Sequence, residues 1–146
     1  MNETVKVGAP LWFKIISALF AIWNLFGLMV FVLAMTVFRG REALENAGLN
    51  EQQVDLTLAT PTWVNVAFGI AVVFGVIGCI TLLLRSQLAI PFLIVSLLGV
   101  LAQNAYMYLL SDTINVMGVG ASPFVIIGAI AVIPYALFCS RSVWFK

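Results

Sequence analysis

Seven amide and aromatic side chains in otherwise apolar stretches are the candidates for chemistry in this chain. Asn24 lies near the middle of the first apolar run, and the others gather towards the ends of the second and third runs. Amides donate and accept hydrogen bonds, and aromatic rings offer flat faces to a ligand. We therefore expect an outward-opening polar cleft that holds a small neutral solute such as a sugar. Its residues would be Asn24, Trp63, Asn65, Gln103, Asn104, Tyr106 and Tyr108.

The same residues have a structural interpretation. Polar side chains within membrane helices often hydrogen-bond to a neighbouring helix, and such couplings average about 0.6 kcal/mol. We favour this interhelical role for these residues over solute binding. Unchanged uptake with lower thermal stability in Asn24→Ala and Gln103→Ala would support it.

The titratable residues argue against ion coupling and catalysis. No Asp, Glu, Arg or His lies in the middle of an apolar run, where proton relays and voltage sensors place them. Asn24 stands where a proton-coupled drug exporter would need a carboxylate. The chain has no histidine and two cysteines, Cys79 and Cys139, without metal-ligand spacing. We expect both cysteines to be reduced packing residues, and we expect no enzyme, no cofactor and no metal site.

Four apolar runs must position these residues. The chain is 63% hydrophobic and only 9% charged, whereas a soluble domain has about a quarter of its residues charged. Each run has about 20 residues or more, enough to cross a bilayer. We predict one all-α domain over 1–146, an integral membrane bundle of four transmembrane helices with a helical extramembrane loop, 39–62, between the first two. The helices are expected at 11–38, 63–84, 88–110 and 122–140.

Two features predict how these helices pack. A stripe of small side chains recurs at every fourth position of the second helix, and small residues let membrane helices approach closely. A chance pattern in a helix rich in Gly and Ala is the alternative. In the fourth helix Pro134 removes one backbone hydrogen bond and predicts a kink, covered by protein rather than lipid. The stripe consists of Ala67, Ala71, Gly75 and Cys79.

The polar loop contains signals for two short helices. Gly48 is placed to end the first, and Asn50 with Gln53 forms a capping-box pattern that begins a second, through Leu58. A loop of this length is often a lid or a docking surface, and a solvated connector is the alternative. Segment 112–121 is expected to be a short, weakly polar turn.

The charges predict the orientation. Four crossings put both termini on one side, and that side has five basic residues against Arg39 and Arg41 on the other. By the positive-inside rule both termini are cytoplasmic. A net charge of +1 gives no sign of nucleic-acid binding. The five basic residues are Lys6, Lys14, Arg85, Arg141 and Lys146.

Three stretches resemble a group of small bacterial proteins with four spans, some of which are labelled "sugar transporter". They are Trp23–Gly27, the run TPTWVNVAFGIAVVFGVIGCITLLLR over 60–85, and PFLIVSLLGVLAQ over 91–103. The resemblance covers most of the chain and implies a bacterial inner membrane. It assigns no binding residues and names no substrate.

Together these observations predict a non-enzymatic membrane protein. We expect an accessory or interaction subunit, in a homo-oligomer or in a larger membrane complex, with the lipid bilayer as its surroundings. The alternative is an oligomeric transporter of a small neutral solute, because four helices alone barely enclose a path.

Overall fold

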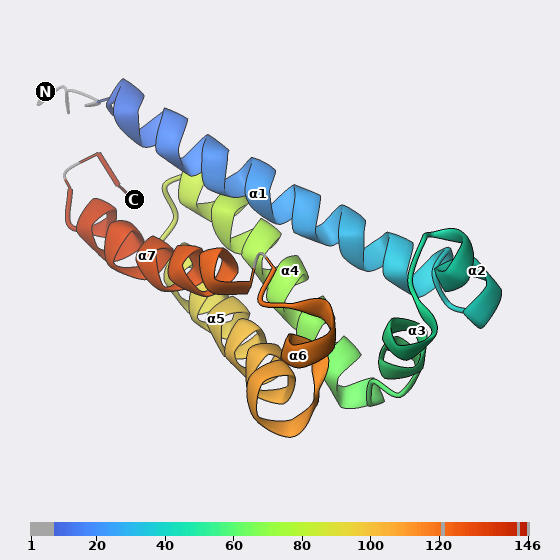
Figure 1. The fold of residues 1–146 in the computed structure, drawn as a ribbon. Helices are drawn as coiled ribbons and strands as arrows, with labels where there is room; N and C mark the ends of the chain where they lie inside the picture. Colours follow the sequence, from blue (N-terminus) through green and yellow to red (C-terminus); the bar gives the residue numbers. More distant parts are fainter. Residues whose placement is uncertain (1–7, 121, 143, 146) are drawn as a thin grey trace, which may run out of the picture.

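The computed structural model describes residues 8–120, 122–142 and 144–145, and every element in this part is helical (Figure 1). This confirms the predicted all-α bundle. The elements are α1 (Leu11–Thr36), α2 (Arg41–Asn46), α3 (Glu51–Leu58), α4 (Thr62–Leu83), α5 (Ala89–Ala105), the π-helical turn η1 (Tyr106–Leu110), α6 (Thr113–Met117) and α7 (Ser122–Ser140).

Four helical segments are long and apolar enough to cross a membrane: α1, α4, α5 continued by η1, and α7. Their bounds agree with the predicted spans within two residues. The largest difference is at α1, which ends at Thr36 rather than Phe38 because the Phe38 amide bonds back to Leu33 O at 3.0 Å. At 1.5 Å per residue α1 is about 39 Å long, more than the ~30 Å hydrocarbon layer, so it must tilt or project.

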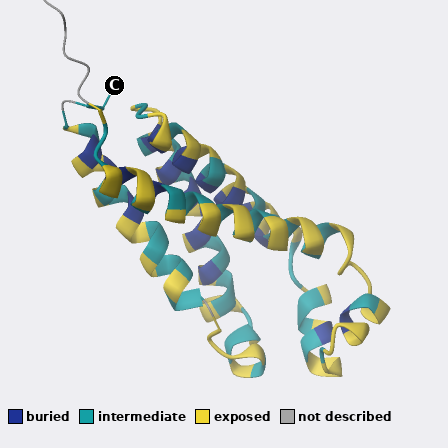
Figure 2. Ribbon diagram, turned by 90° about the horizontal axis from the view of Figure 1, so that it is seen from above, coloured by how far each residue is buried: buried dark blue, intermediate teal, exposed yellow. Residues whose placement is uncertain are grey.

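Helix α4 lies inside the bundle, between α1 on one side and α5 on the other, and α7 packs on α5 (Figures 1 and 2). Its buried residues include the whole predicted stripe of Ala67, Ala71, Gly75 and Cys79. By contrast, only Phe13 and Ser17 of the 26 residues in α1 are buried. Most of α1 therefore faces the surroundings of the bundle.

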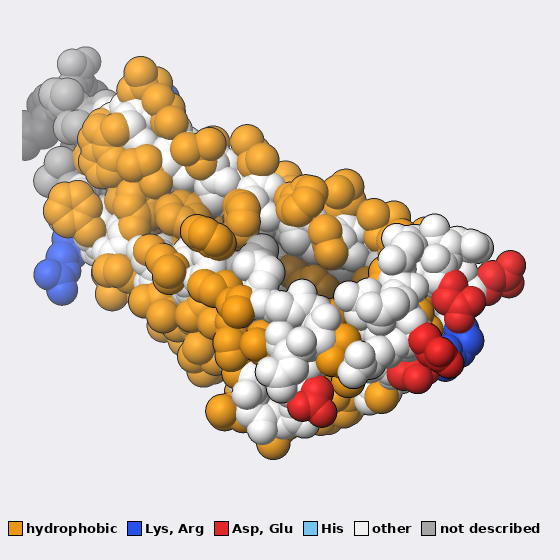
Figure 3. All heavy atoms as spheres, in the orientation of Figure 1, with side chains coloured by type: hydrophobic (Ala, Val, Ile, Leu, Met, Phe, Trp, Pro, Cys, Tyr) orange, Lys and Arg blue, Asp and Glu red, His pale blue; other side chains and the backbone are white. Residues whose placement is uncertain are grey.

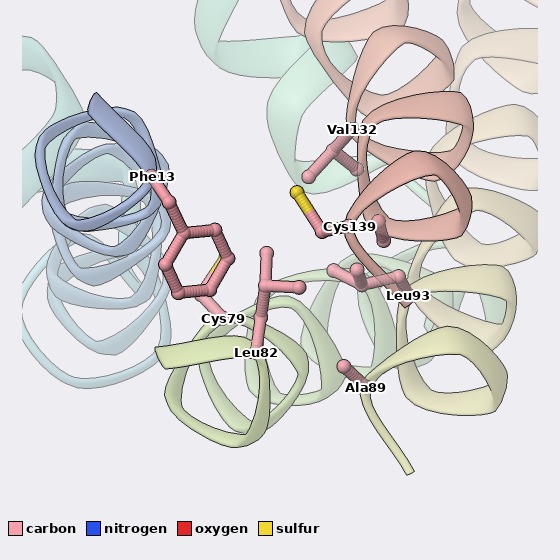
Figure 4. Packing of buried hydrophobic residues seen from close by; sticks show 8 residues of the cluster. Phe13, Cys79, Leu82, Ala89, Leu93, Val132 and Cys139 are labelled. Atoms are coloured by element: carbon pink, nitrogen blue, oxygen red, sulfur yellow. The ribbon is translucent and has the colours of Figure 1, made fainter. Parts of the chain in front are cut away.

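The main hydrophobic core lies at the end of the bundle near the termini. There Phe13 of α1, Leu82 of α4, Leu93 of α5 and Cys139 of α7 point toward one another (Figure 4). Both cysteines are free and buried, as expected of packing residues. Around this core the aromatic rings of Trp12, Phe13 and Tyr135 pack with centroids 6.4 Å apart in each pair.

The loop between α1 and α4 folds as its capping signals predict. Gly48 adopts φ +90° directly after α2, a conformation that glycine reaches without strain. The capping box of α3 is complete, with Gln53 N donating to Asn50 Oδ1 at 2.9 Å and Asn50 N to Gln53 Oε1 at 3.1 Å. Arg41 pairs with Asp55, which joins α2 to α3 and raises the pKa of the guanidinium.

The connection between α5 and α7 differs from the plain turn predicted over 112–121. It contains the short helix α6, and before it the third span ends in the wider π-helical turn η1. Thr113 begins α6 beside Ser111, and their hydroxyls share a hydrogen bond of 2.7 Å. The sequence pattern missed both because each is a single turn with no amphipathic period of its own. Ala121, at the end of the predicted turn, lies outside the described residues.

The first and last described residues lie at the same end of the bundle (Figure 1). The α4–α5 link is at this end too, because Arg85 Nη1 donates to Trp144 O at 3.2 Å and Gln87 Nε2 to Ser140 O at 3.3 Å. This arrangement agrees with an even number of crossings. Lys6 and Lys146, two of the five basic residues behind the predicted orientation, lie outside the described residues.

Candidate functional site

A cavity of about 260 Å³ lies between α1, α4, α5 and α7. In the space-filling view the surface is hollowed, with apolar atoms at the floor, between α1 and the segment that joins α6 to α7 (Figure 3). Most of the lining is aliphatic or aromatic, including Phe20, Trp23, Phe68 and Val100. Three polar side chains interrupt it: Asn24, Ser96 and Gln103.

Asn24 is held in the cavity by two hydrogen bonds from its amide nitrogen. The nitrogen donates to Phe20 O one turn back at 2.9 Å and to Cys79 Sγ of α4 at 3.5 Å. Its oxygen lies against Gly75, where even a methyl group would overlap it. The missing side chain of Gly75 thus makes room for Asn24, whose oxygen accepts no hydrogen bond from the described residues.

Ser96 of α5 lies on the same side of Gly75 as Asn24 and was not singled out from the sequence. Its hydroxyl donates to Ala71 O of α4 at 2.6 Å, a contact that fixes α5 against the small-residue stripe. A Cβ on Gly75 would also come within 3.1 Å of Ser96 Oγ. Two polar groups therefore meet at one glycine. A small polar residue three positions before Gly99 was the available signal, since small residues mark helix seams.

Gln103 and Asn104 are neighbours in sequence but face different surroundings. Gln103 lines the cavity and its side chain forms no hydrogen bond with the described part of the chain. Asn104 is buried: its nitrogen donates to Val100 O at 2.8 Å and its oxygen accepts from Ser122 of α7. Asn104 thus ties α5 to α7, whereas Gln103 lines the cavity.

The other predicted cleft residues lie outside this cavity. Trp63 and Tyr106 form an edge-to-face pair with ring centroids 5.7 Å apart, at the end of the bundle away from the termini. Tyr108 is exposed on η1. Asn65 lines a second cavity, beneath α2 and α3. Of the seven predicted residues, only Asn24 and Gln103 share a cavity.

The cavity reaches the outside between α1 and α7. These two helices meet near the termini, where Ser17 Oγ and Tyr135 Oη share a hydrogen bond of 3.0 Å and Phe20 packs on Tyr135. Further along, Gly128 of α7 lines the cavity, and a Cβ there would meet no atom within 4 Å. The bundle is thus closed at one end and open along this side.

Pro134 lies on the exposed face of α7, and the helix continues through it to Ser140. Ile130, whose carbonyl loses its helical partner to the proline, is itself half exposed. The kink at Pro134 and the protein cover over the freed carbonyl stay predictions.

The cavity has few polar groups. Its polar lining has two amides and one hydroxyl that already donates to the backbone. By fold, the chain belongs to the class of small multi-pass helical membrane proteins. Comparison with protein-family models, with curated proteins and with solved structures gives no match.

Proposed function

We propose that this chain is a non-enzymatic accessory protein of a membrane and that it holds a small, mostly apolar molecule in the cavity between α1, α4, α5 and α7. The observation that carries the proposal is the cavity itself, about 260 Å³ in volume, with an apolar lining and an open side between two membrane helices. An apolar cavity of this kind excludes water and takes up apolar guests.

The volume of the cavity restricts what fills it. Apolar cavities of about 150 Å³ bind benzene, so about 260 Å³ admits a small apolar guest. A hydrocarbon chain or a ring compound fits. The free oxygen of Asn24 and the amide of Gln103 would take one hydroxyl or carbonyl group of such a guest.

Transport of a neutral sugar is the weaker proposal. It has support from the resemblance to the four-span bacterial group and from the two amides in the cavity. However, a sugar carries a hydroxyl on nearly every carbon, and each polar group buried without a partner costs about 1–3 kcal/mol. The cavity offers too few free polar groups to compensate.

The test is photolabelling with an octanol that carries a diazirine, in mild detergent. We expect label on cavity residues such as Trp23 and Val100, located by mass spectrometry, and little label in Gly128→Leu, which fills open space in the cavity. Ala131→Leu is the matched control, because Ala131 is an exposed residue of the same helix.

Three outcomes separate the proposals. Label that is lost in Gly128→Leu and kept in Ala131→Leu supports the apolar guest. Label that is equal in both variants contradicts a specific site. Displacement of the label by glucose, but not by unlabelled octanol, would favour the sugar.

Membrane, orientation and assembly belong to the same proposal. We place the chain in a bacterial inner membrane with both termini cytoplasmic, supported by the basic residues Lys14, Arg85 and Arg141 near the terminal end. Cleavage of a C-terminal tag by a protease added from the periplasmic side would contradict this orientation. Self-association or docking on a larger complex is tested by the mass of the particle purified in mild detergent.

A further inference from the structure

A second cavity, of about 480 Å³, lies beneath the extramembrane loop at the end of the bundle away from the termini. It is an open hollow bordered by the end of α1, by α2 and α3, and by the first turn of α4. Its lining combines apolar side chains such as Met35, Phe38 and Leu58 with polar ones. The polar side chains are Arg39, Thr57, Thr60 and Asn65.

Arg39 is the charged group of this cavity that remains available. The other arginine of the loop, Arg41, is engaged by Asp55 and lies 3.8 Å from Glu45 Oε1. No carboxylate in the described part of the chain comes within 4.0 Å of the Arg39 guanidinium. The two arginines, two positions apart in sequence, therefore differ in whether their charge is neutralised.

The remaining polar groups favour a ligand that accepts hydrogen bonds. The hydroxyls of Thr57 and Thr60 already donate to Gln53 O at 2.8 Å and to Leu56 O at 3.1 Å. This leaves the guanidinium of Arg39 and the amide of Asn65 as donors. Charged donors beside an apolar wall suit an anionic oxygen group, and the planar guanidinium matches phosphate in particular.

We propose that this cavity binds the phosphate of an anionic membrane lipid, with Arg39 as its counter-charge and Asn65 as a second donor. The position fits, because Arg39 follows the end of α1 by three residues, where apolar side chains give way to polar ones. Met35, Phe38 and Leu58 would pack against the first carbons of the acyl chains. This site is separate from the interhelical cavity and is tested independently of it.

The charges of the loop indicate that the phosphate arrives with a lipid rather than free from water. Its exposed surface carries four carboxylates against two arginines (Figure 3), so the loop is negative overall and repels small anions approaching from solution. A lipid phosphate moves in the plane of the membrane and reaches Arg39 from the side. The carboxylates belong to Glu42, Glu45, Glu51 and Asp55.

The experiment compares two charge-removing variants of the full chain in mild detergent. Retention of phosphatidylglycerol, measured by native mass spectrometry against phosphatidylcholine, is expected to fall about fivefold in Arg39→Gln, the effect of one basic residue near an anionic lipid. Arg41→Gln removes the same charge from the same loop and is expected to change retention less than twofold. Arg39→Lys keeps the charge and is expected to recover part of the binding.

Each result decides the proposal. Equal losses in Arg39→Gln and Arg41→Gln would show a diffuse charge effect, and unchanged retention in Arg39→Gln would remove Arg39 from the site; either overturns it. Competition by inorganic phosphate would show that a free anion binds, and would overturn the lipid as its source. A thermal unfolding midpoint of Arg39→Gln within a few degrees of the parent excludes loss of fold as the cause.

Discussion

Two glycines, Gly99 and Gly128, show how differently the two sides of this bundle are built. A Cβ on Gly99 of α5 would lie 2.7 Å from Ala67 O and 2.8 Å from Ala71 N, so α4 and α5 touch at backbone level. A Cβ on Gly128 of α7 would meet nothing within 4 Å, because it faces the cavity. At Gly99 the missing side chain lets α4 and α5 pack closely, whereas at Gly128 it leaves space unfilled beside α7.

The comparison teaches that hydrophobicity does not decide which helices pack together in this protein. Helices α1 and α4 are both apolar enough to cross a membrane, yet α4 is buried along one face and α1 keeps only Phe13 and Ser17 from its surroundings. Lipid tails satisfy an apolar side chain as well as protein does. Close backbone approach and hydrogen bonds between helices distinguish the closed seam from the open side.

The largest expected effect is at the closed seam. Gly99→Leu should lower the free energy of unfolding by about 3 kcal/mol, because the added side chain would push α5 away from the backbone of α4. The measurement is unfolding in detergent, by heat or by titration with a denaturing detergent. Gly128→Leu, the same substitution on the open side, should stay close to the parent. Similar losses in the two variants would contradict the difference between the sides.

The second effect is expected at the contact between α1 and α7 near the termini, which closes one end of the open side. Tyr135→Phe removes the hydroxyl that donates to Phe13 O at 3.1 Å and shares a hydrogen bond with Ser17. We expect a loss of about 1 kcal/mol, as for a hydrogen bond in a partly buried site. Greater access of a lipid-soluble quencher to Trp23 would show that α1 and α7 separate further. Unchanged stability and unchanged quenching would contradict a role of this hydroxyl in holding α1 and α7 together.

A smaller loss is expected from Ser96→Ala, which deletes the 2.6 Å hydrogen bond to Ala71 O and keeps the close packing. Couplings of this kind in membrane helices average about 0.6 kcal/mol. Unfolding of Ser96→Ala measured beside Gly99→Leu would separate the two contributions to the seam. A loss as large as that of Gly99→Leu would mean that the hydrogen bond, rather than the close approach, holds α4 and α5.

The smallest effect is expected for Arg85→Gly, in the link between α4 and α5. Arg85 adopts φ +61°, a position after a helix that normally belongs to glycine, and its guanidinium holds Trp144 O. Arg85→Gly loses that hydrogen bond but relieves a strain of about 1–2 kcal/mol, so its stability should nearly equal that of the parent. Arg85→Ala loses the same hydrogen bond but keeps the backbone strain, so it should be less stable than the parent by about 1 kcal/mol. Equal stability of the two variants would contradict this account.

The fold was largely predictable because long apolar runs and capping signals are local. The four spans and both helices of the loop follow from such signals, including the box of Asn50 and Gln53. The direction in which a polar side chain points, by contrast, cannot be predicted from local sequence signals. Gln103 and Asn104 are about 100° apart around α5, so one faces the cavity and the other Ser122. That rotation is set by contacts such as Gly99 on Ala67, which single-sequence patterns do not give.

The sparse burial of α1 has a consequence for the order of assembly. Helices α4 and α5 hold each other through backbone contacts and are joined by only five residues, 84–88, so they can pair as soon as both have entered the bilayer. Helix α1 is synthesised first but gains its partners, Gly75 and Tyr135 among them, only when later segments arrive. Until α4 is made, the apolar side chains of α1 are therefore covered by lipid alone.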